Sequence, residues 1–203
     1  IPYHVVLDHT MTVRHSGNNM PPSSLINTYI QQLPDPVTEL SVVHQDGWNM
    51  VGLPLEVEDS YYQSLFPDAI NNTLYSYGDG YSLETNLIKG SGYWLRFNEY
   101  GSNIISGESF EELTITLDEG WNMISSISAP IDVNSIDDPY GIVIPNTTYS
   151  FGNGYDLATV LEPGMGYWIR SYGEGNITLS SNTRNGESKF VNSNTDVNTI
   201  SFN

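Results

Sequence analysis

Aromatic side chains recur at matched positions in the two halves of the chain, and aromatic faces can stack on sugar rings. Tyr93-Trp94 and Tyr167-Trp168 form one such matched pair of dipeptides. Neighbouring residues of a strand point to opposite faces of a sheet, so we expect one residue of each dipeptide to be exposed. These four residues are our aromatic candidates for ligand binding.

The tryptophans as a group favour a second interpretation, in which they fill the core. Each follows a glycine or a tyrosine inside a strand motif, and a small sheet needs a bulky residue in each layer. The four matched positions are Trp48, Trp94, Trp121 and Trp168. We expect all four in the core, and a pair of sugar-stacking platforms remains the alternative.

Arg96 and Arg170 are also matched, and they add a positive charge beside the aromatic residues. They lie two positions after Trp94 and Trp168, so they share a strand face with these tryptophans. We expect each arginine to form an ion pair within its own copy or to stack on a tryptophan. The alternative is contact with an acidic glycan, which would make Arg96 and Arg170 ligand-binding residues.

Glycine-rich loops at residues 77–81 and 151–155 carry Asp79 and Asn153, and they read as tight turns. Asp-Gly and Asn-Gly support the positive φ that hairpin turns require. The functional alternative is calcium, which prefers carboxylate and carbonyl oxygens. Weaker calcium candidates are Glu56, Glu58, Asp59, Asp132, Asp137 and Asp138. We expect no other cofactor.

Catalytic motifs are not found in the sequence. The four histidines lack the paired spacing of a zinc site, and the chain has no cysteine to support them. No phosphate-binding loop or nucleophile elbow occurs. Carboxylates are abundant enough for a glycosidase pair, but matched motifs of Gly, Trp and Tyr indicate a scaffold. We expect a protein that is not an enzyme.

The charge balance limits the partners. Asp and Glu number 24 against six Lys and Arg, which gives a formal net charge of −18. A chain this acidic repels nucleic acid and anionic lipid surfaces. No run of about 18 apolar residues occurs, so we expect no membrane insertion. The partner that remains is a polysaccharide or cell-surface polymer of neutral or cationic character.

An internal repeat organises most of the chain. The motif Gly-Trp-Asn-Met at residues 47–50 returns at 120–123, and residues 75–97 match 149–171 at 13 of 23 positions without a gap. The offset between the copies is 73 residues at the first motif and 74 at the second. We assign the repeats to residues 37–107 and 108–180.

Each copy shows a series of short strands separated by turns. Residues 113–117 alternate apolar and polar side chains, residues 121–127 follow a turn at 118–120, and residues 175–180 end the copy as a strand. Residues 157–161 are expected to form one or two helical turns, ended by Pro163-Gly164. The fold class that we predict is mainly β, with two small repeats that resemble a barrel or a sandwich.

The ends of the chain differ from the repeats. Residues 3–7 and 11–14 predict a hairpin, and residues 23–32 predict one α-helix with a serine cap. Residues 181–203 are rich in Ser, Asn and Thr, which indicates a polar linker or the start of a further domain. The first residue is Ile1 and not Met, which is typical of a fragment or a processed product.

Residues 1–36 resemble the last third of a thioredoxin-like domain. Pro2 stands where that family has a cis-proline before its hairpin, and residues 23–32 would be its final helix. The cysteine-containing half of the family is missing, so no redox activity carries over. We expect Ile1-Pro2 to be trans and the segment to pack on the first repeat or on a neighbouring molecule. The alternative is that the hairpin and helix belong to the repeat domain.

Residues 40–180 resemble the Gly-Trp-Asn and Gly-Tyr-Trp modules found in tandem in large secreted proteins of marine, Bacteroidetes-like bacteria. This resemblance implies an extracellular or cell-surface location and contact with other domains of a parent chain. It carries no activity. Two hypotheses follow: an accessory module that binds carbohydrate or another surface weakly, and a structural spacer that presents an upstream thioredoxin-like enzyme domain.

Overall fold

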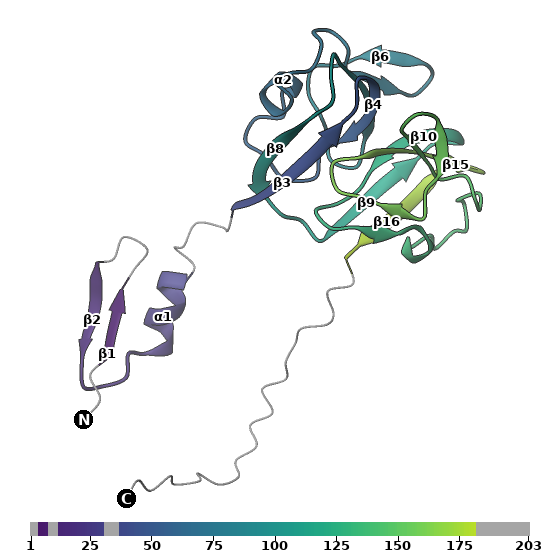
Figure 1. Cartoon of the computed structure of the whole chain (residues 1–203). Coiled ribbons are helices and arrows are strands. Elements are labelled where there is room, and N and C mark those ends of the chain that lie inside the picture. The colour runs from purple at the N-terminus through teal and green to yellow at the C-terminus, as the bar shows by residue number, and fades with distance from the viewer. Residues whose placement is uncertain (1–3, 8–11, 31–36, 182–203) are drawn as a thin grey trace, which may run out of the picture.

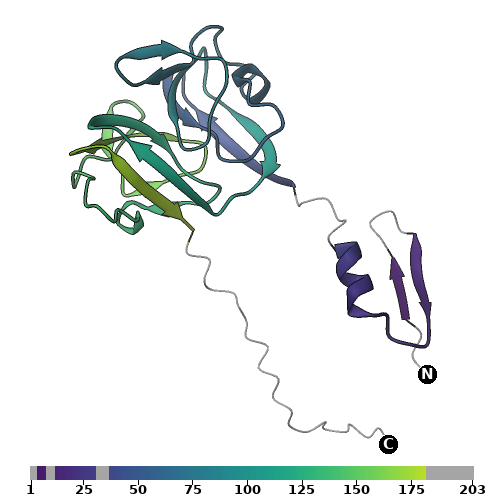
Figure 2. The same ribbon diagram turned by 180° about the vertical axis from the view of Figure 1, so that it is seen from behind.

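The chain folds mainly into antiparallel β-structure, as predicted (Figure 1). The structure is a computed structural model that describes residues 4–7, 12–30 and 37–181. Within these ranges no sheet closes into a barrel, and the arrangement is sandwich-like. The strand-rich body contains both repeats, and the N-terminal hairpin and helix lie apart from it (Figures 1 and 2).

The N-terminal unit is a two-stranded hairpin beside a short helix. β1 (His4–Leu7) pairs antiparallel with β2 (Val13–Gly17), and α1 is Ser23–Ile30. The guanidinium of Arg14 lies 6.0 Å from the ring centre of Tyr29 on α1, which links helix and hairpin. The predicted hairpin and helix are therefore present, and residues 31–36 and the Ile1-Pro2 bond lie outside the described residues.

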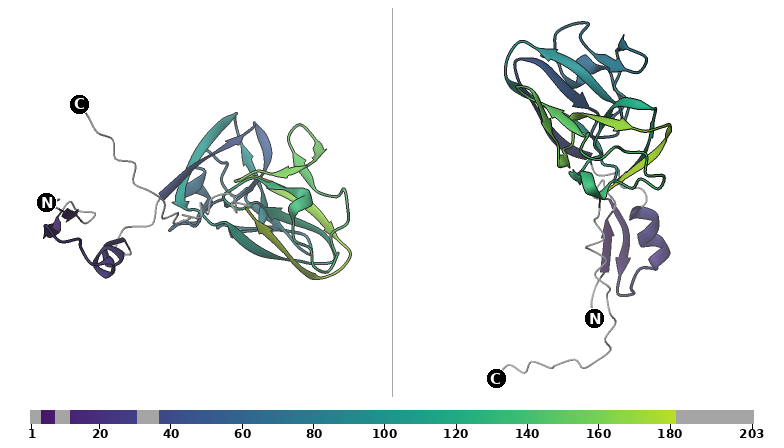
Figure 3. Two further views of the ribbon diagram at one scale, coloured as in Figure 1. Left: turned by 90° about the horizontal axis from the view of Figure 1, so that it is seen from below. Right: turned by 90° about the vertical axis from the view of Figure 1, so that its right-hand side faces the viewer.

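This unit does not pack on the first repeat, which was one of its two expected positions. Figure 3 shows the hairpin and α1 separated from the strand-rich body in both further views. Val5, Leu7 and Val13 of the hairpin are exposed. The described hairpin and helix thus lie outside the strand-rich body, and whether they belong to the same domain as the repeats stays a prediction.

The first repeat consists of two sheets and one short helix. β3 (Val37–His44) pairs with β8 (Gly101–Glu108), and α2 is Tyr62–Leu65. The second sheet has the order β4-β7-β5-β6. Its strands are β4 (Gly47–Gly52), β5 (Tyr75–Tyr77), β6 (Tyr81–Leu83) and β7 (Gly92–Phe97).

The second repeat has the same strand pairing. β9 (Glu112–Leu117) pairs with β16 (Gly175–Ser180), and the four-stranded sheet has the order β10-β15-β12-β13. Its strands are β10 (Gly120–Ser125), β12 (Tyr149–Phe151), β13 (Tyr155–Leu157) and β15 (Gly166–Ser171). The registers agree too, since Trp48 faces Arg96 across β4 and β7, and Trp121 faces Arg170 across β10 and β15.

The helical turns predicted at residues 157–161 are wrong. β14 (Val160–Leu161) instead pairs antiparallel with β11 (Ile131–Asp132), and the only helical piece nearby is the 3-10 turn η1 (Val133–Ser135) among the described residues. Val160 is β-branched and suits a strand. Leu161 is buried, so the pairing places it in the core of the second repeat.

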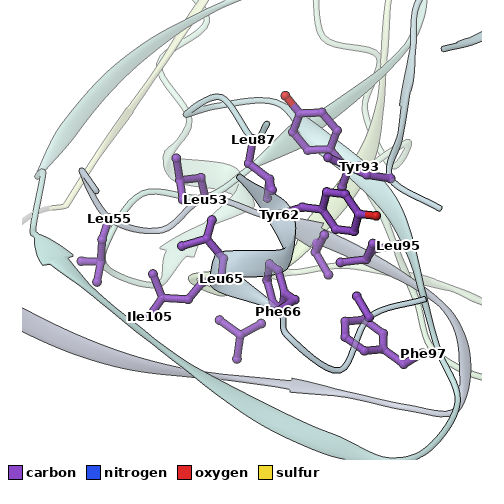
Figure 4. Packing of buried hydrophobic residues seen from close by; sticks show 14 residues of the cluster. Leu53, Leu55, Tyr62, Leu65, Phe66, Leu87, Tyr93, Leu95, Phe97 and Ile105 are labelled. Atoms are coloured by element: carbon purple, nitrogen blue, oxygen red, sulfur yellow. The ribbon is translucent and has the colours of Figure 1, made fainter. Parts of the chain in front are cut away.

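Strand alternation divides the side chains of each four-stranded sheet between two buried layers. Tyr93, Leu95 and Phe97 of β7 point into the core of the first repeat, where they meet α2 and β8 (Figure 4). Trp94 points to the other face. The second repeat does the same, since Tyr167 and Ile169 enter its core. Each sheet therefore has an inner face toward its own repeat and a second face toward the other repeat.

The second faces of the two sheets pack on each other. Met50, Trp94, Met123 and Trp168 form a buried cluster between the repeats. Its contacts are reciprocal, because Tyr77 meets Trp168 and Phe151 meets Trp94 with the same ring-centre distance of 4.8 Å and the same angle of 80°. Reciprocal contacts of this kind define an isologous interface, here between two halves of one chain.

Glycine allows the backbones of the two repeats to approach closely. The backbone N–H of Gly52 donates to the carbonyl of Gly164 at 3.0 Å, and Ser125 donates in the matched way to Gly90 at 2.9 Å. A Cβ atom at Gly52 would lie 2.1 Å from the Cβ of Ser125, its own counterpart in the second repeat. No real Cβ tolerates that distance, so the contact requires glycine at this position.

Gly52→Ala should destabilise the protein by about 1–3 kcal/mol, because the added methyl group forces the repeats apart. Urea denaturation followed by tryptophan fluorescence measures the change. Adding Ser125→Gly to Gly52→Ala removes the opposing side chain, so the double variant should recover part of the loss. Equal losses in the single and double variants would show that the Gly52–Ser125 contact does not set the spacing.

Ser125→Ala should leave stability unchanged or raise it by up to about 1 kcal/mol. The hydroxyl of Ser125 is buried and has no hydrogen-bond partner among the described residues. Removing the hydroxyl therefore eliminates a desolvated polar group without breaking a hydrogen bond. A clear loss of stability in the same urea experiment would mean that the hydroxyl has a partner in solution.

Candidate aromatic binding cleft

Tyr93 and Tyr167 are buried, with 2% and 3% of their surface exposed, so the prediction of exposure is wrong for these two candidates. Their hydroxyl groups explain why they face inward. The oxygen of Tyr93 accepts the backbone N–H of Ile88 at 3.0 Å, and that of Tyr167 accepts the N–H of Glu162 at 2.7 Å. Each tyrosine thus anchors the loop that precedes its own strand.

Burial also changes the acidity of these phenols. It raises the pKa of Tyr93, and it raises the pKa of Tyr167 to about 12, against the opposing effect of the hydrogen bond from Glu162. Both hydroxyls therefore stay protonated across the physiological pH range. They act as structural groups of the cores.

Trp94 and Trp168 are buried as predicted, but they lie between the repeats and not inside one of them. Trp48 and Trp121 differ from that expectation, because each is 40% exposed. They stand at the edge of the buried cluster, where each ring meets the neighbouring tryptophan edge-on. The ring-centre distances are 6.5 Å for Trp48 and Trp94, and 6.2 Å for Trp121 and Trp168.

Two hollows open beside these exposed tryptophans, and each is lined only by aromatic residues. The Trp121 hollow has a volume of about 470 Å³ and the Trp48 hollow about 490 Å³. Lining residues of the Trp121 hollow are Tyr77, Tyr81, Trp121, Tyr149, Tyr155 and Trp168. Those of the Trp48 hollow are Trp48, Tyr75, Tyr81, Trp94, Phe151 and Tyr155.

The hollows are equivalent under exchange of the repeats. Every residue of one set has its sequence counterpart in the other set, so the two sites present the same chemistry except for Tyr77 against Phe151. Tyr81 and Tyr155 line both hollows, which makes the hollows adjoin, and each of these tyrosines is 57% exposed. We refer to the two hollows together as the aromatic cleft.

Each hollow requires both repeats. In the Trp48 hollow, Phe151 comes from the second repeat, and in the Trp121 hollow, Tyr77 comes from the first. Tyr81 and Tyr155 reach the cleft from the outermost strands β6 and β13 of their sheets. They pack on Tyr77 at 5.3 Å and on Phe151 at 5.2 Å between ring centres. The turns at residues 78–80 and 152–154 join the hairpin strands and place them there. The positive φ predicted for these turns is found at Gly80 but at none of residues 152–154.

Arg96 and Arg170 are exposed beside the cleft. The guanidinium of Arg170 lies 5.8 Å from the ring centre of Trp121, which is the stacking predicted for this residue. Among the described residues neither arginine has an ion-pair partner within reach, so the predicted ion pairs are not found. The positive charge at the rim of the Trp121 hollow is therefore available to a ligand.

Two of the carboxylates considered for calcium, Asp59 and Asp132, serve local structure. Asp59 accepts the Ser64 hydroxyl and the Tyr61 N–H, and these bonds lower its pKa. Asp132 caps η1 by accepting the N–H of Asn134. The described residues contain no group of three or more His, Asp and Glu side chains that could hold a metal ion.

His44 is buried, with 1% of its surface exposed. Its Nε2 lies 2.8 Å from the carboxylate of Asp68, and its ring stacks on Phe97 at 3.7 Å. His4 and His15 are half-buried on the hairpin. None of the described helices is long and apolar enough to cross a membrane.

Comparisons with known proteins yielded no relative: no protein-family model, curated protein or solved structure matches the chain significantly. The chemistry of the aromatic cleft therefore carries the functional argument.

Tyr167→Phe should lower stability by about 1–2 kcal/mol at neutral pH, because the N–H of Glu162 loses its acceptor. It should also flatten the alkaline stability profile. The raised pKa of Tyr167 stabilises the fold fully below pH 10, and this contribution disappears as pH rises toward about 12. Urea denaturation from pH 9 to 12 tests both effects. Parallel profiles for the variant and the original chain would contradict this assignment.

Proposed function

We propose that this chain is a non-catalytic accessory module of a larger extracellular protein, and that its aromatic cleft binds a neutral carbohydrate polymer. The observation that carries the proposal is the pair of equivalent hollows, each lined by six aromatic side chains and open at an exposed tryptophan. Volumes near 470 and 490 Å³ are in the range of small-molecule sites.

The type of lining supports a sugar ring as the ligand. A pyranose has apolar C–H faces that stack on an indole or a phenol, and its hydroxyl groups need polar atoms at the edge of the site. Exposed Trp48 and Trp121 provide the stacking faces, and the phenol groups of Tyr81 and Tyr155 provide the polar tips. This combination suits a ligand that is apolar on its faces and polar on its rim.

The charge of the chain argues for a neutral or cationic polymer. The formal net charge of −18 repels an anionic polysaccharide at long range. Arg170 offers one local positive charge, and this is small against the total. Stacking needs no charge, so a neutral polymer meets no electrostatic penalty when it enters the cleft.

Two adjoining hollows provide for bivalent binding. A polymer that occupies both gains from the high effective concentration of the second site after the first has bound. Weak contacts in each hollow can then add to a useful retention on a polymer surface. This property suits an accessory module that holds a parent protein near its polymer.

Replacing both exposed tryptophans should abolish this retention. Trp48→Ala with Trp121→Ala should weaken binding by about 30-fold or more, because the aromatic side chains that a ligand covers dominate such interfaces. Affinity electrophoresis against neutral β-glucan, xylan, mannan and galactan measures it, with chitosan as the cationic polymer and alginate as the anionic one. Each single variant should retain one hollow and lose the gain from bivalence.

The matched control is Tyr100→Ala with Tyr172→Ala, because both tyrosines are 67% exposed and neither lines a hollow. This control should bind as the original chain does. Urea denaturation of each variant verifies folding. Retention that persists in the double tryptophan variant would place the site elsewhere, and no retention on any polymer would favour a spacer.

A spacer is the second candidate, and the exposed face of the N-terminal hairpin supports it. Val5, Leu7 and Val13 are apolar and exposed there, as expected for strands that belong to a larger sheet. In this role the repeats present an upstream thioredoxin-like enzyme domain, whose final hairpin and helix are β1, β2 and α1. The polysaccharide panel separates this candidate from the first.

A further inference from the structure

The two repeats differ where α2 of the first repeat is replaced by η1 of the second. Both pieces begin at an equivalent point of the backbone. The N–H of Tyr62 donates to the carbonyl of Thr85 at 3.0 Å, and the N–H of Val133 donates to Thr159 at 2.9 Å. Thr85 and Thr159 are counterparts in the repeat alignment. Tyr62 in the first repeat therefore corresponds to Val133 in the second.

Tyr62 fills a defined slot in the first repeat. Its ring is buried among the core side chains that Figure 4 shows around α2. Its phenolic oxygen accepts the backbone N–H of Asn72 at 2.8 Å. Asn72 adopts a left-handed backbone with φ of 59°. The slot thus runs from the backbone beside Thr85 to the amide of Asn72, and a phenol ring occupies its whole length.

The second repeat keeps the far end of this slot. Asn146 is the counterpart of Asn72 and has the same φ of 59°, so its N–H has the same direction relative to the chain. This N–H has no hydrogen-bond partner among the described residues. Val133 is too short to reach it, and Thr148 replaces the buried Leu74 beneath the slot. The acceptor that the first repeat supplies is missing in the second.

A cavity of about 300 Å³ occupies this place in the second repeat. Val133, Thr159 and Asn146 line it, and they are the counterparts of Tyr62, Thr85 and Asn72 in the first repeat. Leu157 and Ala158, which precede Thr159 in the chain, also line the cavity. The cavity is therefore the space of the missing tyrosine ring.

We propose that this cavity, the phenol slot, binds a neutral free phenolic compound whose ring lies as that of Tyr62 does and whose oxygen accepts the N–H of Asn146. The carboxylate of Asp138 also lines the slot, where it already accepts the N–H groups of Ile142 and Val143. A further lone pair of this carboxylate can accept the phenol O–H, and its charge excludes phenolates and aromatic acids.

A titration of the full chain with p-cresol tests the proposal, because p-cresol is the side chain of tyrosine. Amide NMR should show a downfield shift of the Asn146 N–H as the phenol binds. Toluene lacks the hydroxyl group and should bind about fivefold more weakly. Val133→Tyr fills the slot from within and should weaken p-cresol binding by about tenfold or more. Thr148→Leu, which restores the bulk of Leu74, should weaken it in the same direction.

The first repeat offers the converse experiment. Tyr62→Ala empties the matching slot and should lower the melting temperature, and p-cresol should raise that temperature again by refilling the cavity. The Trp48→Ala and Trp121→Ala variant should retain the Asn146 shift, which separates this site from the aromatic cleft. The proposal thus stands or falls independently of carbohydrate binding.

Three results would overturn the proposal. The first is an unchanged Asn146 resonance at millimolar p-cresol. The second is unweakened binding in a folded Val133→Tyr variant. The third is N-acetyltyrosinamide binding more tightly than p-cresol, because the occupant would then be a tyrosine of another polypeptide and not a free phenol.

Discussion

The close contact between the two four-stranded sheets is the constraint on which the aromatic cleft depends. Gly52 lies against Ser125 with no room for a second Cβ atom, so the sheets come near enough to bury Trp94 and Trp168 between them. Trp48 and Trp121 lie just beyond this buried centre. The hollows exist because the sheets meet over part of their faces only, and neither repeat alone could form one.

The sequence predicts those features that depend on neighbouring residues. Alternation over 113–117 leads to a strand at nearly the correct bounds, and the strand predicted at 175–180 has the bounds that the structure shows. Pairing between distant segments is harder to infer, which is why residues 157–161 were expected to be helical although Val160 and Leu161 pair with β11. Alternation also shows that Tyr93 and Trp94 face opposite ways. It cannot show that both faces of the sheet are buried, because the second face is covered by the sheet of the other repeat.

Most residues that line the cleft are shared by the two repeats, whereas the inner cores of the repeats differ at several positions. Matched positions line the cleft and the contact between sheets, as with Trp48 and Trp121. Further differences lie inside each repeat, besides Gly52 against Ser125 at the contact and Tyr77 against Phe151 in the cleft. His44 pairs with Asp68 in the first repeat, and Leu117 takes the place of His44 in the second. A substitution on one side of the contact between the repeats must fit the residue on the other side. A substitution in one inner core requires no change in the other repeat. This freedom produced a filled slot at Tyr62 and an open one at Val133.

The reciprocal arrangement of the repeats also restricts what kind of contact the cleft can make with a polymer. A polysaccharide has a direction, and two sites exchanged by a two-fold relation meet one chain in opposite orientations. Hydrogen-bonding groups at fixed positions would suit one orientation and fail in the other. Stacking on an aromatic ring depends little on the direction of the chain, because either orientation presents the same apolar faces. Lining by Trp, Tyr and Phe alone is therefore the chemistry that allows both hollows to hold a single chain.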